Sequence, residues 1–117
     1  MIKNKNEELN ALVQELKKLA IQKDVKLWKR IAEDLEKPTR NRRAVNVYKL
    51  SKYSKENDTV IIPGKVLGTG ELSHKLNVAA FNFSEEAKRK ISEKGKAISI
   101  PDLMKQNPDG KNIKILG

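Results

Sequence analysis

Residues 76–83, LNVAAFNF, are the part of the chain that decides the fold. The run is nearly continuous in apolar residues, which is typical of a strand buried on both of its faces. The segments around it alternate between the patterns of short strands and short helices. The second half of the chain is therefore predicted to be a mixed α/β structure.

The residues after this strand carry clear helix signals. Ser84 is a suitable N-cap, and Glu85 and Glu86 follow in the first turn, where negative charge interacts favourably with the helix dipole. Gly95 lies where that helix is expected to end. The remaining expected elements are a strand over residues 97–100, a helix over 101–106, a turn over 107–110 and a strand over 112–116.

Glycine and proline divide the residues before this strand. Residues 59–62 form a β-branched run, PG at 63–64 interrupts it, and residues 65–67 resume it. GTG at 68–70 then breaks the pattern a second time. The glycine spacing fits neither phosphate-loop template, so tight turns between short strands explain it more simply. Such turns also let backbone N–H groups approach an RNA phosphate.

The first part of the chain is predicted to be helical. Apolar residues recur at spacings of three and four along residues 9–20 and again along 28–35, which places an apolar stripe on each of two helices. Asn4 and Glu7 resemble a capping box for the first helix. Asp24 is a suitable cap for the second helix.

A third helix is predicted over residues 44–53, although the β-branched and aromatic residues there also suit a strand. Pro38 separates it from the second helix, because proline cannot donate a backbone hydrogen bond. Residues 1–54 are thus expected to be mainly helical, and residues 55–117 to form the mixed α/β body. The length of 117 residues predicts a single domain.

Charge is concentrated in residues 37–53, KPTRNRRAVNVYKLSKY. The formal net charge of the chain is +10, and this stretch contributes +6 because it holds six basic residues and no acidic one. From residue 84 onward charges of both signs alternate, which is typical of a solvated face. The basic stretch therefore indicates a surface that meets a polyanion.

We interpret the basic stretch as a binding site for the backbone of a nucleic acid. The guanidinium groups of Arg40, Arg42 and Arg43 are suited to bidentate phosphate contacts. Lys49 and Lys52 extend the same patch if the following segment is helical. The candidate RNA-binding residues are Lys37, Arg40, Asn41, Arg42, Arg43, Lys49, Lys52, Gly64, Lys65, Gly68, Gly70 and Lys75.

The aromatic residues allow two interpretations. Asn46, Tyr48 and Tyr53 could stack on bases or bond to them, as aromatic side chains do in RNA-binding proteins. For Tyr48 and Trp28 we expect packing instead, since both lie among apolar residues at helical spacing.

DNA is the alternative partner, because counterion release does not distinguish the two polymers. Residues 44–53 could imitate the recognition helix of a helix-turn-helix, which would make the protein a free DNA-binding regulator. The preceding spacer, however, holds a proline and three arginines in place of a tight glycine turn. RNA therefore ranks first.

Composition excludes several classes of function. The chain has no cysteine, so disulfides and thiolate metal sites are excluded. Its longest apolar runs are far shorter than the ~20 residues that a membrane helix needs, and its amino terminus lacks the apolar stretch of a signal peptide. We expect a cytoplasmic protein with no cofactor, metal, membrane or small-molecule substrate.

Catalysis finds little support in the sequence. The one histidine, His74, follows Ser73, but no nucleophile elbow surrounds them. Carboxylate pairs at residues 7–8 and 85–86 stand at the starts of helices, where capping explains them. We expect that the protein is not an enzyme.

Three ordered blocks carry a more specific signal. They are PGKVLG at residues 63–68 with Gly70, VAA at 78–80 with FS at 83–84, and NP at 107–108 with Gly110. These blocks resemble the L-fifteen/L-eighteen-e family of large-subunit ribosomal proteins. The resemblance covers nearly the whole chain, from about residue 9 to residue 117.

The resemblance implies an irregular β-β-α superhelix of short strands and helices, preceded by a helical portion. It also implies binding to large-subunit ribosomal RNA (rRNA) and a role in assembly and structural support, with neighbouring ribosomal proteins as further candidate partners. Eukaryotic members continue into a long basic tail, whereas this sequence stops at Gly117, so it resembles the archaeal form.

Overall fold

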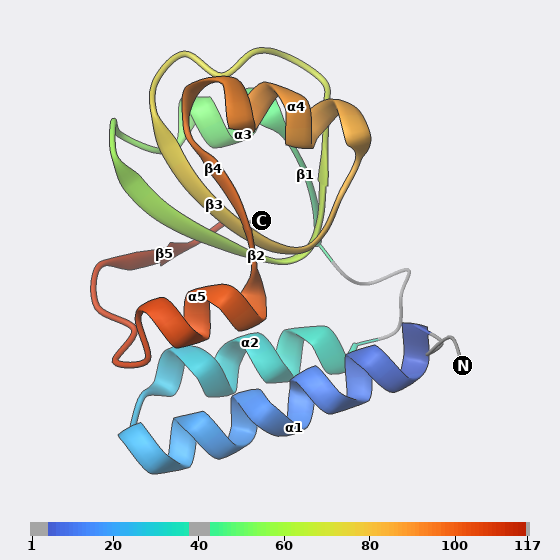
Figure 1. The fold of residues 1–117 in the computed structure, drawn as a ribbon, viewed down its shortest axis with the longest axis vertical. Helices are drawn as coiled ribbons and strands as arrows, with labels where there is room; N and C mark the ends of the chain where they lie inside the picture. Colours follow the sequence, from blue (N-terminus) through green and yellow to red (C-terminus); the bar gives the residue numbers. More distant parts are fainter. Residues whose placement is uncertain (1–4, 38–42, 117) are drawn as a thin grey trace.

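The computed structural model describes residues 5–37 and 43–116. Two helices, α1 (Lys5–Lys23) and α2 (Lys26–Glu36), lie along one face of a sheet and are followed by alternating strands and helices (Figure 1). The predicted α/β class with a helical amino-terminal part is confirmed.

Within the described residues, five strands form one parallel sheet. They are β1 (Arg43–Asn46), β2 (Asp58–Leu67), β3 (Leu76–Phe83), β4 (Lys96–Ser99) and β5 (Ile113–Ile115). Their order is β1-β2-β3-β4, and β5 also pairs with β2. Because β3 occupies one edge of β2, β1 and β5 share the other edge: β1 pairs with residues 64–67 and β5 with residues 59–61.

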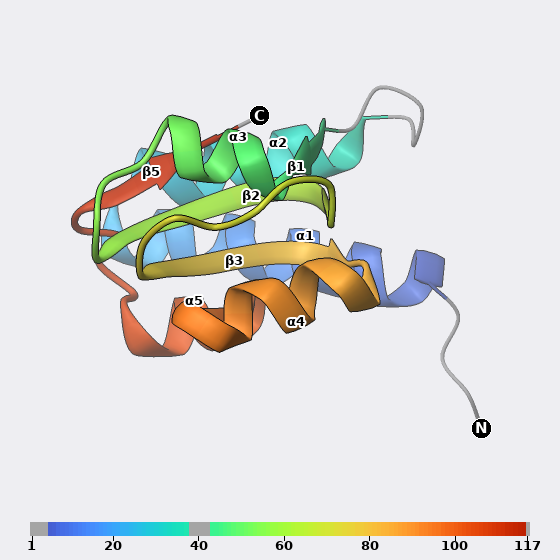
Figure 2. The same ribbon diagram turned by 90° about the horizontal axis from the view of Figure 1, so that it is seen from above.

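Helices cover both faces of this sheet (Figures 1 and 2). One face packs against α1, α2 and α5 (Ile100–Gln106), and the other packs against α3 (Val47–Lys52) and α4 (Glu85–Lys94). Neighbouring residues of β3 enter opposite cores, since Val78 and Ala80 face α3 and α4 whereas Ala79 faces α1 and α2. The strand predicted to be buried on both faces is therefore confirmed.

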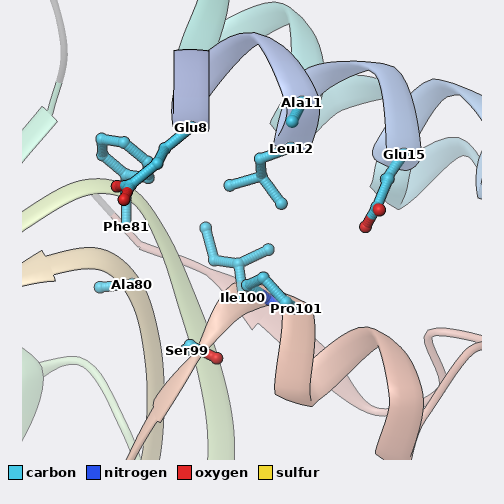
Figure 3. A pocket seen from close by; sticks show the side chains of 9 residues that line it. All are labelled: Glu8, Ala11, Leu12, Glu15, Ala80, Phe81, Ser99, Ile100 and Pro101. Carbon is cyan, nitrogen blue, oxygen red and sulfur yellow. The ribbon is translucent and has the colours of Figure 1, made fainter. Parts of the chain in front are cut away.

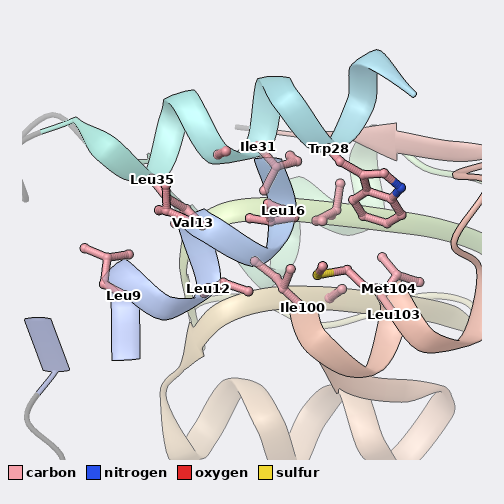
Figure 4. Packing of buried hydrophobic residues seen from close by; sticks show 13 residues of the cluster. Leu9, Leu12, Val13, Leu16, Trp28, Ile31, Leu35, Ile100, Leu103 and Met104 are labelled. Carbon is pink, nitrogen blue, oxygen red and sulfur yellow. The ribbon is translucent and has the colours of Figure 1, made fainter. Parts of the chain in front are cut away.

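The core beneath α1 and α2 is built from the predicted apolar stripes (Figure 4). Trp28 is fully buried there, and its indole N–H donates to the backbone carbonyl of Pro108 at 2.8 Å. Packing is thus the correct interpretation of Trp28. The buried members of this core are Leu9, Leu12, Val13, Leu16, Trp28, Ile31, Ala32, Leu35, Ile61, Ala79, Ile100, Leu103 and Met104.

Several predicted helix ends are confirmed. The hydroxyl of Ser84 accepts from the Ala87 amide, and Gly95 is the C-cap of α4. The prediction for Asp24 is wrong, because Val25 occupies the N-cap of α2 and Asp24 adopts a positive φ of 53° between the two helices. Asn4, of the expected capping box, lies outside the described residues.

Three predicted boundaries need correction. The helix expected over residues 44–53 begins at Val47, because residues 43–46 pair with β2 as a strand. Pro63-Gly64 does not end a strand: β2 continues through it, and the pairing with β3 shifts register between Ile62 and Lys65. Ile100 belongs to α5 and not to β4.

Residues 68–75 connect β2 to the parallel strand β3 without a helix. We call them the crossover strap. The strap must return along the length of β2, whose ten residues are joined by nine Cα–Cα steps and extend about 30 Å at about 3.3 Å per step. Nine steps of chain reach at most about 32 Å. The strap therefore runs in a largely extended form along the sheet (Figure 2), and Leu72 anchors it in the core on the α3 and α4 side.

Candidate nucleic-acid interface

Helix α3 presents an exposed stripe of tyrosines and lysines. Val47 and Leu50 point into the core. The stripe consists of Tyr48, Lys52 and the half-buried Lys49 of α3 and of its C-cap Tyr53, and the spacings of three and four place them on one side of the helix. The side chains of Tyr48 and Tyr53 are each 53% exposed. The packing expected for Tyr48 is therefore wrong: the helix begins at Val47, which turns Val47 inward and Tyr48 outward.

Lysine and tyrosine approach each other within this stripe. The Nζ atom of Lys52 lies 5.4 Å from the centroid of the Tyr53 ring. A cation at that distance over an aromatic face is attracted by the ring quadrupole. The stripe thus combines positive charge with half-exposed aromatic rings, which is the combination that proteins use to stack bases and neutralise phosphates.

The crossover strap is bonded along its length to α3 and to the start of β2. The Tyr48 amide donates to the Thr69 carbonyl at 3.1 Å, and the Asn57 amide donates to the Lys75 carbonyl at 2.8 Å. Between them, the Ser73 amide donates to the hydroxyl of Ser51 at 3.0 Å. These bonds set the end of the strap, with the exposed side chain of Lys75, beside the end of α3.

His74 adds a second connection. Its Nε2 atom lies 2.9 Å from the Ser54 hydroxyl, and its Nδ1 atom lies 3.0 Å from the Ser73 hydroxyl. The Ser54 hydroxyl also donates to the Leu50 carbonyl, so the half-buried imidazole joins the strap to the last turn of α3. We call Tyr48, Lys49, Lys52, Tyr53 and Lys75 the α3–strap face.

Lys90 of α4 holds the other end of the strap. Its ammonium donates to the carbonyl of Gly68 at 2.7 Å and to that of Gly70 at 2.6 Å. It also lies 3.4 Å from the carboxylate of Glu71 and 3.3 Å from that of Glu86. With its side chain only 10% exposed, Lys90 replaces the water that these oxygens would otherwise bind.

Two glycines let the strap lie close to the helices. A Cβ at Gly68 would stand 2.7 Å from the Cβ of Glu86. A Cβ at Gly70 would stand 2.4 Å from that of Tyr48, and the φ of Gly70 is +93°. Gly68 and Gly70 therefore have a packing role, and their carbonyls are bonded to Lys90. Gly64 lies inside β2, opposite Arg43 of β1.

Other candidate residues lie apart from the α3–strap face. Val66 belongs to the core beneath α3 and α4, so the exposed neighbour Lys65 projects from the opposite face of the sheet. Lys37 follows α2, and its ammonium lies 3.1 Å from the carboxylate of Asp34. That ion pair offsets part of the charge that Lys37 would offer to a phosphate.

The arginine part of the basic stretch is only partly visible. Arg40, Asn41 and Arg42 lie outside the described residues. Arg43 is the first residue of β1, and its backbone alone is described. The structure therefore brings together Lys49, Lys52, Gly70 and Lys75, and places Lys65 and Lys37 elsewhere.

The Ser73–His74 pair lacks the arrangement of a hydrolase. Both ring nitrogens of His74 are bonded to serine hydroxyls and not to an orienting carboxylate. Residues 5–37 and 43–116 contain no group of three or more metal-ligating side chains. No helix in this part of the chain is both long and apolar enough to cross a membrane.

Sequence reasoning missed Lys90 and His74 as organisers of this surface. The Glu86–Lys90 spacing of four is a signal typical of an ion pair on one helix, and it could have pointed to Lys90. Nothing in the sequence showed that the same ammonium reaches two carbonyls 22 and 20 residues earlier.

Comparisons with known proteins give a consistent result. The model of the family described as "Ribosomal protein 60S L18 and 50S L18e" matches residues 1–117. The chain is 44% identical to large ribosomal subunit protein eL18 of Sulfurisphaera tokodaii over 108 residues, 92% of each chain. It is 43% identical to eL18 of Methanothermobacter thermautotrophicus over 112 residues, 95% of this chain and 93% of that relative. With eL18 of Methanoregula boonei it shares 40% identity over 116 residues, 98% and 96% of the two chains.

Proposed function

Because the chain belongs to the family of ribosomal protein 60S L18 and 50S L18e, we propose that it is a structural constituent of the large ribosomal subunit, which binds and stabilises folded rRNA through a basic surface. The family is one of ribosomal proteins, so the protein is structural and not an enzyme. Its expected location is the ribosome of the cytoplasm, and its expected partners are rRNA and adjacent ribosomal proteins.

The α3–strap face is the observation that carries this proposal. Two half-exposed tyrosines flank Lys49 and Lys52 there, and no acidic residue occurs between positions 37 and 53. Tyrosine rings stack on bases of any sequence, and lysines neutralise phosphates. The strap is bonded at both ends, so the face is already in place before it meets RNA. Preorganisation lowers the entropic cost of binding.

The arginines of the basic stretch would extend the contact. In the sequence, Arg40, Arg42 and Arg43 lie between α2 and α3 and add three positive charges to the basic stretch. We expect that changing all three to Gln weakens rRNA binding and leaves the thermal midpoint of unfolding within about 2 °C. Unchanged binding would mean that the arginines are only solvated surface.

The DNA-binding alternative has less support. A helix-turn-helix requires its recognition helix to follow another helix after a short turn. Strand β1 stands between α2 and α3, and α3 has only six residues, of which Val47 and Leu50 are buried. Such a short helix, held against the sheet, is poorly suited to enter a major groove.

Binding measurements on the full chain test the lysine part of the face. The variant Lys49→Gln/Lys52→Gln/Lys75→Gln should lower affinity for large-subunit rRNA and flatten the dependence of log K on log salt by roughly 2 to 3, because each phosphate contact contributes about 0.7 to 0.9 to the slope. The matched control Lys18→Gln/Lys23→Gln/Lys105→Gln removes the same charge from exposed positions of α1 and α5. Equal losses in the two variants would refute the assignment of the face.

Sedimentation tests the assembly itself. A lysate is run through a sucrose gradient with and without a high-salt wash, and the protein is followed by mass spectrometry. We expect near-equimolar migration with the large subunit that survives the wash. If the protein occurs only in the light fractions, it is not an integral ribosomal component.

A further inference from the structure

A groove crosses the surface between α1, the end of β3 and the start of α5 (Figure 3). Its volume is about 320 Å³. It lies on the side of the sheet opposite the α3–strap face, because α1 and α5 belong to the other core. The residues that line it are Glu8, Ala11, Leu12, Glu15, Ala80, Phe81, Ser99, Ile100 and Pro101.

Apolar side chains form most of the groove and two carboxylates stand at its ends. Figure 3 shows Leu12, Ile100 and Pro101 between Glu8 and Glu15. Both glutamates are exposed, and no lysine or arginine lines the groove. An apolar surface rimmed by charge is a common feature of protein interaction sites.

The negative charge of the groove excludes RNA, which is the partner that the basic remainder of the molecule favours. The chain has a formal net charge of +10, yet this groove carries two negative charges and no positive one. A phosphate backbone would be repelled by Glu8 and Glu15, which no cation of the described chain neutralises within the groove. The complementary occupant is a cation attached to apolar groups, which a protein segment provides and RNA does not.

The spacing of the glutamates specifies that segment further. They lie seven positions apart on α1, which is two helical turns and about 10.5 Å along the axis at 1.5 Å per residue. An extended peptide covers the same distance in about three residues. Two Lys or Arg residues about 10 Å apart, with apolar residues between them, would place each cation at one carboxylate and the apolar residues over Leu12 and Ile100.

We propose that this groove docks a segment of another protein of the large subunit, in which two basic residues flank apolar ones. The inference rests on the proposed function, since it needs the chain to be part of the subunit. It gives the molecule two interaction surfaces of opposite charge: the α3–strap face for rRNA, and the α1–α5 groove for a basic protein segment.

Site-specific photocross-linking in intact subunits tests this inference. The full chain carries Ala11→p-benzoylphenylalanine, and subunits that contain it are purified, illuminated and analysed by mass spectrometry. Ala11 is exposed and lines the groove. The control site is Asn10→p-benzoylphenylalanine, which is exposed on a different side of the same helix. We expect the Ala11 position, and not the Asn10 position, to cross-link to a protein segment with two Lys or Arg residues around apolar ones.

The carboxylates are tested in the same experiment. Adding Glu8→Gln/Glu15→Gln should lower the cross-link yield at least about threefold, as expected for the loss of two partly exposed ion pairs. The matched control Glu33→Gln/Glu56→Gln removes the same charge from exposed positions elsewhere and should leave the yield unchanged.

Each contrary outcome has a definite meaning. Four outcomes would overturn the inference and leave the proposed function standing. They are cross-links to rRNA, cross-links to residues 1–4 of the same chain, the absence of any cross-link, and a cross-link yield that does not change when Glu8 and Glu15 are replaced. Absence of the chain from large subunits would overturn the proposed function, and this inference with it.

Discussion

Replacing Lys90 by methionine should loosen the crossover strap. The Lys90 ammonium donates to the carbonyls of Gly68 and Gly70 and lies near two carboxylates. Methionine fills nearly the same volume but cannot donate a hydrogen bond. Lys90→Met therefore removes the donor and leaves the packing of the side chain largely intact.

The contacts set the size of the effect. Hydrogen bonds from a charged donor contribute about 1.5–3 kcal/mol each, and the glutamates count for little because their side chains are 60% and 82% exposed. The two bonds are only part-buried, so water replaces part of the lost bonding, and we expect a cost of about 2–4 kcal/mol. For 117 residues the unfolding entropy is about 0.25 kcal/mol/K, so the thermal midpoint should fall by about 8–16 °C.

Calorimetry and hydrogen exchange measure this prediction. The control is Lys88→Met, which removes the same charge from an exposed position of the same helix and should shift the midpoint by about 2 °C or less. In Lys90→Met, amide exchange should accelerate at residues 68–75 before it does in β3, because the free energy of local opening of the strap is lower. Equal midpoints in the two variants, or unchanged exchange in the strap, would refute the role assigned to Lys90.

Three further predictions follow from the described contacts. Gly70→Ala should lower the free energy of unfolding by about 2–4 kcal/mol in urea titrations, because φ is +93° and the new Cβ would stand 2.4 Å from that of Tyr48; a stable variant would contradict this. The Lys55 amide and then the Lys114 ammonium hold the pKa of Asp58 below its ordinary value of 3.8, so their contribution to stability is present above pH 3.8 and is lost as the pH falls through the lower folded pKa. The stability gap between the wild type and Asp58→Asn should therefore be wider at pH 5 than at pH 2.5, and a constant gap would argue against the linkage. Calorimetry should also show one unfolding transition, as predicted for a single domain whose two cores share one sheet; two separate transitions would contradict it.

Much of the fold could be predicted because its signals are local. The buried strand at residues 76–83, the Ser84 cap and the two amphipathic helices each depend on residues within a few positions of one another. Two of the failures occurred where distant pairing outweighed local preference. Residues 43–46 are a strand because β2 supplies their hydrogen-bond partners, and β2 passes through Pro63-Gly64 because strands on both sides hold it.

The candidate site divides in the same way. Charge counting found Lys49, Lys52 and the arginines, since composition requires no knowledge of the fold. Packing was predicted for Tyr48, but its side chain is half-exposed. The direction of this side chain depends on where β1 ends and α3 begins. The α1–α5 groove could not be predicted from the sequence, because its walls come from residues as far apart as Glu8 and Pro101.

The sequence by itself determined the α/β class, the uneven charge and the family, since each of these depends on local composition or on short ordered blocks of residues. Only the tertiary structure decided that a glycine-rich connection is a bonded strap, that Lys90 holds it, and that the two charged surfaces lie on opposite faces of the sheet. The physical reason is that contacts between distant residues depend on the register and packing of the whole sheet, which no short stretch of chain specifies.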